Sequence, residues 1–313
     1  MVAALAFLLI VAGGLVTSNN AGLAVPDWPT SFGHLFKIPK MIGGVKFEHG
    51  HRMIAEFVGL LTIACAVWTW AVDKRRWMRV LTVGAVLGVV VQGVIGGIGV
   101  KQLLPPWISS LHATFGQTMF CALAAIAVFT SRSWMEEPAE KISRKDARPL
   151  LRHCWMLIVF LYLQLILGAA FRHVWTKWGP SGSNHWPVDR ILHAFLYPHM
   201  LNALIVSGLI LYVSLRTLTR HGGVPHLRRP ALWLLLLLIA QLLLGVSAYV
   251  VRVVQGINEA QPTMSLVVVT VAHLAVGALI LLLTAVLTIQ GYRHSGDSAT
   301  VIPFDRKREV ATA

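Results

Sequence analysis

Residues 78–100 read MRVLTVGAVLGVVVQGVIGGIGV, and Arg79 is their only charged side chain. A helix of about 20 mostly apolar residues spans the roughly 30 Å hydrocarbon core of a bilayer, so this stretch predicts a transmembrane helix. Similar stretches occupy 2–18, 51–72, 109–130, 154–172, 193–215, 230–251 and 264–290. Strands of a membrane barrel would alternate apolar and polar residues over about 10 residues, which the run LLLLL at 234–238 does not. The sequence therefore predicts an all-α integral membrane protein with eight transmembrane helices.

The first stretch has a second interpretation. Because Ala21–Ala24 follows it, this stretch could be a cleaved signal peptide. Such a peptide begins with a positively charged segment, however, and no Lys or Arg precedes this stretch. We therefore expect 2–18 to be the first helix. The missing basic leader also fits a translation start further upstream.

The net charge of +14 is distributed along the chain as membrane topology requires. Cytoplasmic connections of membrane proteins carry an excess of Lys and Arg. Of the 27 basic residues, 18 fall in the even-numbered connections and the tail, and nine fall near the odd-numbered ones: Lys37, Lys40, Lys46, Arg52, Lys101, Arg172, Lys177, Arg190 and Arg252. We expect both termini in the cytoplasm, the chain in the cell membrane in contact with lipid, and no nucleic-acid partner.

The two halves of the chain repeat one pattern. A glutamine followed four residues later by a glycine occurs at 92–96, 164–168 and 241–245, and HRMIA at 51–55 and HATFG at 112–116 align with HMLNA at 199–203 and HLAVG at 273–277. A long internal period indicates a duplicated structural unit. We expect two parallel four-helix bundles at 1–131 and 154–290, a cytoplasmic linker at 132–153 and a cytoplasmic tail at 291–313.

Four of the 13 histidines, His51, His112, His199 and His273, lie near the starts of even-numbered helices. Ionisable side chains inside a membrane are costly and usually functional, and imidazole is a common axial ligand of haem iron. The simpler interpretation is a histidine bonded to a neighbouring helix, but four at matching depth favour two haem sites, each with two axial histidines that bind its iron.

The other histidines are weaker candidates. His193 competes with His199, but the repeat alignment favours His199, and His49 turns to a different helix face from His51. The rest lie in predicted connections or beside them: His34, His153, His173, His185, His221, His226 and His294.

Several charged residues accompany these sites. Glu48 lies three residues before His51, on the same helix face, where it could accept a proton beside the iron or simply favour the helix N-terminus. Helix six has Leu196 at the equivalent position, so the first half is expected to do chemistry. Arg172, Arg252 and Lys101 could bind haem propionates or extend to the membrane interface. The long first loop, 18–47, is typical of a lid.

The motifs GGLVTS at 13–18, DWP at 27–29, Glu48-x-x-His51-Arg52, QGVIGG at 92–97 and LHA at 111–113 closely resemble the haem A synthase family, and the resemblance covers about residues 5–290. It implies an enzyme that oxidises the C8 methyl group of haem O to a formyl group by successive hydroxylations, producing haem A for terminal oxidases. It implies that His51 and His112 hold the haem substrate with Arg52 nearby, that Glu48 is essential, and that His199 and His273 hold a haem b cofactor. Haem O synthase and an electron donor are the implied partners.

Two features depart from the family pattern. Some members carry a cysteine pair in the first outward loop, and residues 18–47 contain none. His199 follows Tyr197-Pro198 rather than a leucine-rich segment. Two other functions stay open: a dihaem b-type electron-transfer cytochrome, and a transporter built from parallel repeats. The electron donor, the oxygen source and the oligomeric state do not follow from the sequence.

Overall fold

The computed structural model describes residues 1–35, 37–136, 138, 141–180, 186–255 and 262–296, and throughout this part of the chain the regular structure is helical. The predicted tail lies outside the described residues from position 297 onward. The elements in chain order are α1 (Val2–Ser18), α2 (Val45–Val72), α3 (Arg76–Lys101), α4 (Pro106–Phe129), α5 (Arg132–Met135), α6 (Arg144–Trp178), α7 (Val188–Ile191), the π-helix η1 (Leu192–Leu196), α8 (Tyr197–His221), α9 (Pro225–Tyr249), the π-helix η2 (Val250–Val254) and α10 (Met264–Arg293).

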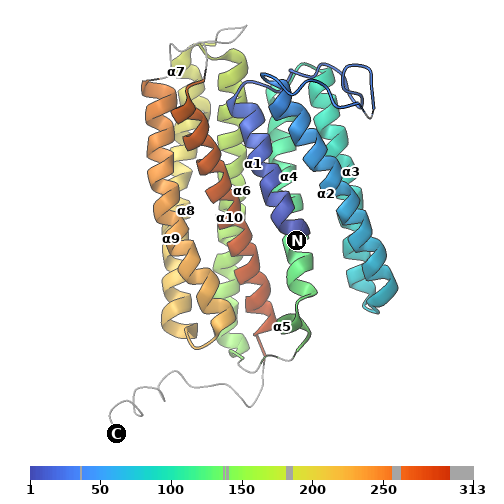
Figure 1. Cartoon of the computed structure of the whole chain (residues 1–313). Coiled ribbons are helices and arrows are strands. Elements are labelled where there is room, and N and C mark those ends of the chain that lie inside the picture. Colours follow the sequence, from blue (N-terminus) through green and yellow to red (C-terminus); the bar gives the residue numbers. More distant parts are fainter. Residues whose placement is uncertain (36, 137, 139–140, 181–185, 256–261, 297–313) are drawn as a thin grey trace.

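The predicted all-α membrane fold is confirmed. In the described residues seven helical units are long and apolar enough to cross a membrane, namely α2, α3, α4, α6, α7 to α8, α9 to η2, and α10. The eighth predicted helix is α1, which is apolar but has only 17 residues. At 1.5 Å per residue it covers roughly 25 Å, and its first residue lies partway along the bundle (Figure 1).

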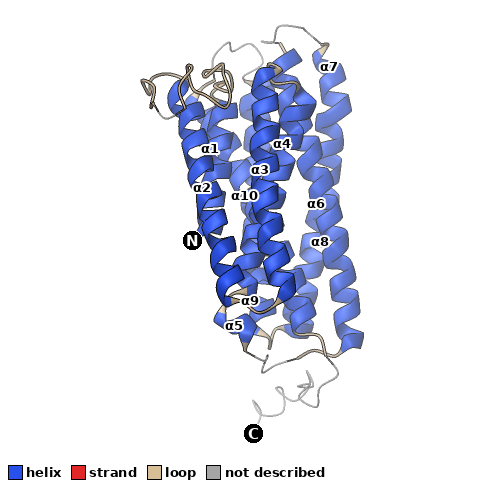
Figure 2. Ribbon diagram, turned by 90° about the vertical axis from the view of Figure 1, so that its right-hand side faces the viewer, coloured by secondary structure: helices blue, strands red, loops and turns tan. Residues whose placement is uncertain are grey.

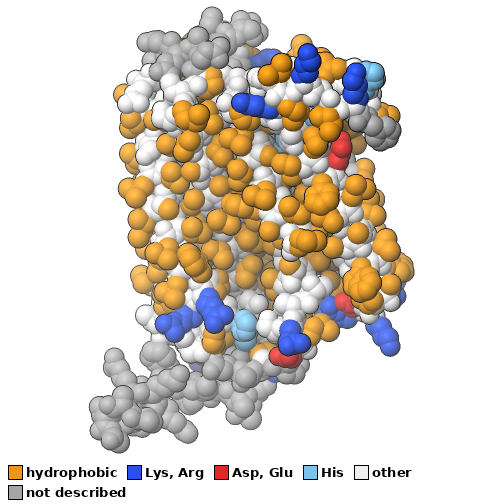
Figure 3. Space-filling model, viewed as in Figure 1, with side chains coloured by type: hydrophobic (Ala, Val, Ile, Leu, Met, Phe, Trp, Pro, Cys, Tyr) orange, Lys and Arg blue, Asp and Glu red, His pale blue; other side chains and the backbone are white. Residues whose placement is uncertain are grey.

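The long helices stand side by side as one elongated bundle (Figures 1 and 2). In the first half α1 packs on α2, α2 on α3, and α3 on α4; in the second half α6, α8, α9 and α10 pack in the same sequential manner. The halves meet where α4 contacts α6 and α10 and where α1 contacts α10. On the face shown in Figure 3, apolar side chains cover the middle and basic side chains lie near the two ends, as expected of a lipid-facing bundle.

Several helices extend beyond their apolar segments. The polar residues 144–153, expected in a linker, form the first turns of α6, where the Ser143 side chain accepts a hydrogen bond from the backbone of Asp146. A side-chain oxygen at this position satisfies an N–H group that has no partner within the helix. Hydropathy detects only the part of a helix that lies in lipid, so this polar extension was missed.

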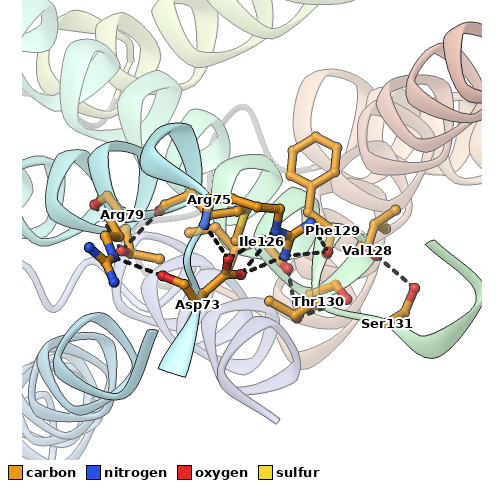
Figure 4. Close-up of polar contacts among 11 residues, drawn as sticks. Asp73, Arg75, Arg79, Ile126, Val128, Phe129, Thr130 and Ser131 are labelled. Carbon is orange, nitrogen blue, oxygen red and sulfur yellow. Dashed lines mark hydrogen bonds and ion pairs between the residues drawn. The ribbon is translucent and has the colours of Figure 1, made fainter. Parts of the chain in front are cut away.

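An ion-pair cluster closes the turn between α2 and α3 at one end of the bundle (Figure 4). The Arg75 guanidinium pairs with the Asp73 carboxylate at 2.6 Å, and both of its terminal nitrogens donate to the Phe129 carbonyl at 3.1 Å. Hydrogen bonds from Arg75 lower the pKa of Asp73. Because the last carbonyls of a helix lack partners within it, Arg75 both caps α4 and attaches the turn to it.

Candidate functional site

The structure places the four selected histidines in two pairs near the end of the bundle that carries the first loop. His51 of α2 lies beside His112 of α4, with ring centres 6.5 Å apart and planes at 77°. His199 of α8 lies beside His273 of α10, with ring centres 6.4 Å apart and planes at 66°. The two pairs thus have nearly the same geometry in the two halves.

This spacing fits one metal ion between the rings of each pair. A metal–imidazole bond is about 2 Å long, and a ring nitrogen lies about 1 Å from its ring centre, so two imidazoles that held one metal between them would have centres up to roughly 6 Å apart. Both observed distances are close to that value. The donor set, two neutral imidazoles, is one that haem iron accepts.

Each histidine ring packs against a glycine of the helix that precedes its own. A Cβ atom on that glycine would approach the ring Cε1 atom to 3.2 Å for Gly13 and His51, 2.9 Å for Gly96 and His112, 2.8 Å for Gly168 and His199, and 3.3 Å for Gly245 and His273. Glycine therefore lets the imidazole lie directly against the neighbouring backbone. Gly93, one residue after Gln92, instead adjoins open space.

Three of these glycines, Gly96, Gly168 and Gly245, follow a glutamine by four residues. Each glutamine contacts the histidine that packs on its glycine. The Gln92 amide donates to the main-chain oxygen of His112 at 2.9 Å, and the amide nitrogens of Gln164 and Gln241 lie 3.1 and 3.4 Å from Nε2 of His199 and His273. The sequence pattern contained these glutamines, but it gave no reason to place them at the histidines.

The Gln164 backbone also fixes the tautomer of its histidine. Nδ1 of His199 lies 3.1 Å from the Gln164 carbonyl, which can only accept a hydrogen bond, so Nδ1 carries the proton and Nε2 keeps its lone pair. Nε2 is therefore the nitrogen that would bind a metal, in place of the hydrogen bond that it accepts from the Gln164 side-chain amide at 3.1 Å. In α1 the position corresponding to the glutamines is Leu9, so His51 has no such amide beside it.

Glu48 and Arg52 form a buried ion pair one helical turn apart beside His51. The Glu48 side chain is only 5% exposed, and its Oε1 lies 2.6 Å from Nη2 of Arg52 while its Oε2 accepts from the Val25 amide at 2.8 Å. Arg52 also donates to the carbonyls of Val25, Asp27 and Thr30 at 3.0, 2.7 and 3.1 Å. The ion pair therefore neutralises the buried carboxylate and fastens the first loop onto α2. Arg52 was expected to lie near a haem. In the structure both of its terminal nitrogens donate to Glu48 and to the loop carbonyls.

The first loop folds over the His51–His112 pair from two sides. Asp27 accepts hydrogen bonds from Thr30 Oγ1 and from the amides of Gly33 and Phe32, and these bonds lower its pKa to about 2. The Trp28 ring lies against Gly97 of α3, where a Cβ atom would overlap it. Gly97 directly follows the glycine that packs on His112, so the loop contacts α2, which carries His51, and α3, which packs on His112.

Arg172 and Arg252 bring positive charge to the junction of the two halves. Arg172 donates to the Thr17 carbonyl of α1 at 2.7 Å and to Thr176 Oγ1 at 2.8 Å. Arg252, in η2, is 8% exposed, and its buried Nη2 has no hydrogen-bond partner. Among the described residues neither guanidinium contacts a carboxylate, so this region is suited to an anionic group.

The other described histidines belong to neither pair, although His173 interacts electrostatically with His112. His193 is exposed. Its Nδ1 lies 2.9 Å from the main-chain oxygen and 3.2 Å from a carboxylate oxygen of Asp189, four residues earlier. His49 contacts Ser31 Oγ at 3.0 Å. His173, expected at a loop, lies within α6 because that helix continues to Trp178. His185 lies outside the described residues.

Comparisons with known proteins show the family of the chain. The model of the cytochrome oxidase assembly protein family COX15-CtaA matches residues 45–285. The chain is similar to a heme A synthase of Symbiobacterium thermophilum, with 30% identity over 258 residues covering 77% of this chain and 81% of the relative. It is also similar to heme A synthases of Shouchella clausii (25% identity, 77% and 81% covered) and Exiguobacterium sp. (25%, 67% and 68%). The chain therefore belongs to the COX15-CtaA family of haem A synthases, as its motifs predicted.

Proposed function

We propose that this protein is a haem A synthase, an oxidoreductase that converts the C8 methyl group of haem O into the formyl group of haem A. The observation that carries the proposal is the asymmetry between the two histidine pairs. Both pairs have nearly the same spacing, but among the residues that the structure describes an ion pair of the Glu48–Arg52 kind, which fastens a loop to the helix, accompanies His51–His112 and not His199–His273. Family membership supports the same assignment.

In this proposal His51 and His112 orient the haem substrate. When bound, haem iron supplies the one-electron and oxygen chemistry that side chains cannot. The conversion is a four-electron oxidation in which two C–H bonds of the methyl group are replaced by C–OH and the doubly hydroxylated carbon loses water to become the formyl group; this chain's side chains supply no oxidant, so the oxygen atoms and oxidising equivalents come from dioxygen, or from water with an electron acceptor. Glu48 lies one turn from His51 and accepts a proton released beside the substrate, while Arg52 holds the Glu48 side chain in position through their ion pair. The fastened loop excludes bulk water.

His199 and His273 hold haem b as a cofactor that passes electrons. Leu196 of η1 lies three residues before His199, where the first half has Glu48 before His51. The second pair therefore has no carboxylate at the position equivalent to Glu48. Arg172 and Arg252 bind the propionates of this haem, because two guanidinium groups without carboxylate partners suit two carboxylates. The electron-carrier and transporter alternatives gain no support from the relatives.

We further propose the orientation in the cell membrane. The loop end faces outward and both termini face the cytoplasm, because most basic residues lie toward the opposite end. The first bundle (1–131) is the substrate unit and the second (154–290) the cofactor unit. Haem O synthase supplies the substrate, and an unidentified donor supplies the electrons.

The proposal is tested by co-expressing the chain with a source of haem O and separating the extracted haems by chromatography. Glu48→Gln should abolish haem A while haem b stays bound, because the proton acceptor is lost and the second pair is untouched. Glu56→Gln is the matched control, since Glu56 is an exposed carboxylate on the same helix. Wild-type amounts of haem A in the Glu48 variant would remove this carboxylate from the mechanism.

A further inference from the structure

A basic and apolar surface projects from the first loop, formed by residues 31–35 and 37–42. The sequence from 31 to 47 contains Lys37, Lys40 and Lys46 and no acidic residue. Large apolar side chains of this surface are exposed: Phe32 by 48%, Leu35 by 64%, Ile38 by 61% and Ile42 by 68%. Exposed apolar groups beside positive charge usually mark an interaction site.

The base of this surface is held in place. The amides of Phe32 and Gly33 donate to the Asp27 carboxylate, and Ser31 and His34 exchange two backbone hydrogen bonds of 2.8 and 3.2 Å. Ser31 Oγ also contacts His49 Nδ1 of α2 at 3.0 Å. The exposed apolar side chains are therefore presented by an anchored turn.

Between these side chains lies an open hollow of about 430 Å³. One part of its lining is polar and basic, with Ser31, His34, Lys37 and Lys40; the other part is apolar, with Phe32, Ile38 and Pro39. A ligand that fills it should combine an anionic head with an adjoining hydrocarbon portion.

The position of the hollow identifies the kind of ligand. The loop reaches outward beyond α2 in two perpendicular views (Figures 1 and 2), and basic and apolar side chains gather at this corner (Figure 3). Below the loop, α2 presents Phe57 and Leu60, 53% and 66% exposed, to the surrounding lipid. The surface thus lies beside lipid at the level where a membrane-spanning helix begins, where lipid headgroups lie.

We propose that this surface binds the headgroup of an anionic phospholipid, with Lys37 and Lys40 contacting its phosphate and Phe32 and Ile38 contacting the start of its acyl chains. A lysine at an anionic membrane surface contributes about 1 kcal/mol, so the two lysines together correspond to roughly 30-fold in affinity. The site is separate from the histidine pairs, and the inference does not depend on the proposed activity.

The test uses the full chain in nanodiscs of phosphatidylcholine containing a small fraction of phosphatidylglycerol, followed by detergent extraction and phospholipid analysis of the purified protein. Wild type should retain phosphatidylglycerol in excess of its share of the bilayer. The double variant K37Q/K40Q should need roughly 30-fold more phosphatidylglycerol for the same retention. The matched control is R228Q/R229Q, which removes two exposed charges from the other end of the bundle.

Four results would overturn the inference: equal retention by both double variants, no preference for phosphatidylglycerol in wild type, displacement by inorganic phosphate alone, which would indicate a free-anion site, and retention only when a second protein copurifies. Haem content of the same samples checks folding. Unchanged haem with reduced lipid retention separates this inference from the proposed function.

Discussion

The close approach of each imidazole to a glycine gives a graded prediction. Ordinary contact for a Cβ atom begins at 3.4 Å, so alanine at position 168 would require the His199 ring to move by about 0.6 Å, since the present distance is 2.8 Å. Alanine at position 245 would require only about 0.1 Å of movement by His273, at 3.3 Å. A metal–nitrogen bond is about 2 Å long, so the first displacement is a large fraction of the bond and the second is negligible.

We expect Gly168→Ala to lose most of its haem b and Gly245→Ala to keep nearly all of it. Overpacking a tight contact typically costs about 1–3 kcal/mol, which exceeds the gain of up to about 1 kcal/mol from replacing glycine with alanine in a helix. Gly208→Ala on α8 is the control, because nothing lies within 4 Å of its Cβ position.

The assay is haem b per protein by pyridine haemochrome, with the low-spin signal in electron paramagnetic resonance as a measure of paired coordination. Because all three variants are helical Gly→Ala changes, differences between them report the imidazole contact rather than helix propensity. Full haem b in Gly168→Ala, or equal losses in all three variants, would refute the packing argument.

Three further predictions concern the loop and the opposite end. Arg52→Gln should expose the first loop to proteolysis, because three carbonyls and a carboxylate lose their donor; unchanged cleavage would show that the loop is held elsewhere. The pKa of Asp27 is lowered from 3.8 to about 2, so its stabilisation of the loop is complete above about pH 4 and is lost as pH falls toward 2. As the pH falls from 4 to 2, pepsin should therefore cleave the loop of the wild type increasingly fast relative to that of Asp27→Asn. A ratio of the two cleavage rates that stays constant over this range would contradict the role of the Asp27 carboxylate in holding the loop. Arg75→Met should destabilise the protein by about 1–2 kcal/mol through the uncapped Phe129 carbonyl, seen as a lower thermal midpoint than that of the exposed control Arg76→Met.

The apolar segments of the helices could be predicted because bilayer thickness imposes a length that hydropathy detects. The helix ends could not: α2 begins at Val45 rather than 51 and α6 at Arg144 rather than 154, since their first turns are polar. The π-helices η1 and η2 also have no signature in composition. They lie just before His199 and at Arg252, and single π-helical turns are often found at functional sites.

The histidines could be selected from the internal repeat, but their surroundings depend on contacts between distant parts of the chain. Glu48 could equally have been a helix-end charge; its burial follows from the Val25 amide, 23 residues earlier. The contact of Trp28 with Gly97 joins a loop to a helix and follows from no local pattern. The glutamine and glycine spacing was visible, yet only the packing of neighbouring helices shows that both residues contact a histidine ring.

The most direct test of the two-site account is the haem content of His112→Ala and His273→Ala, purified from cells that also produce haem O. His112→Ala should retain haem b and contain no haem A, whereas His273→Ala should lose haem b and still contain haem O. The same haem composition in both variants would contradict the assignment of separate substrate and cofactor sites.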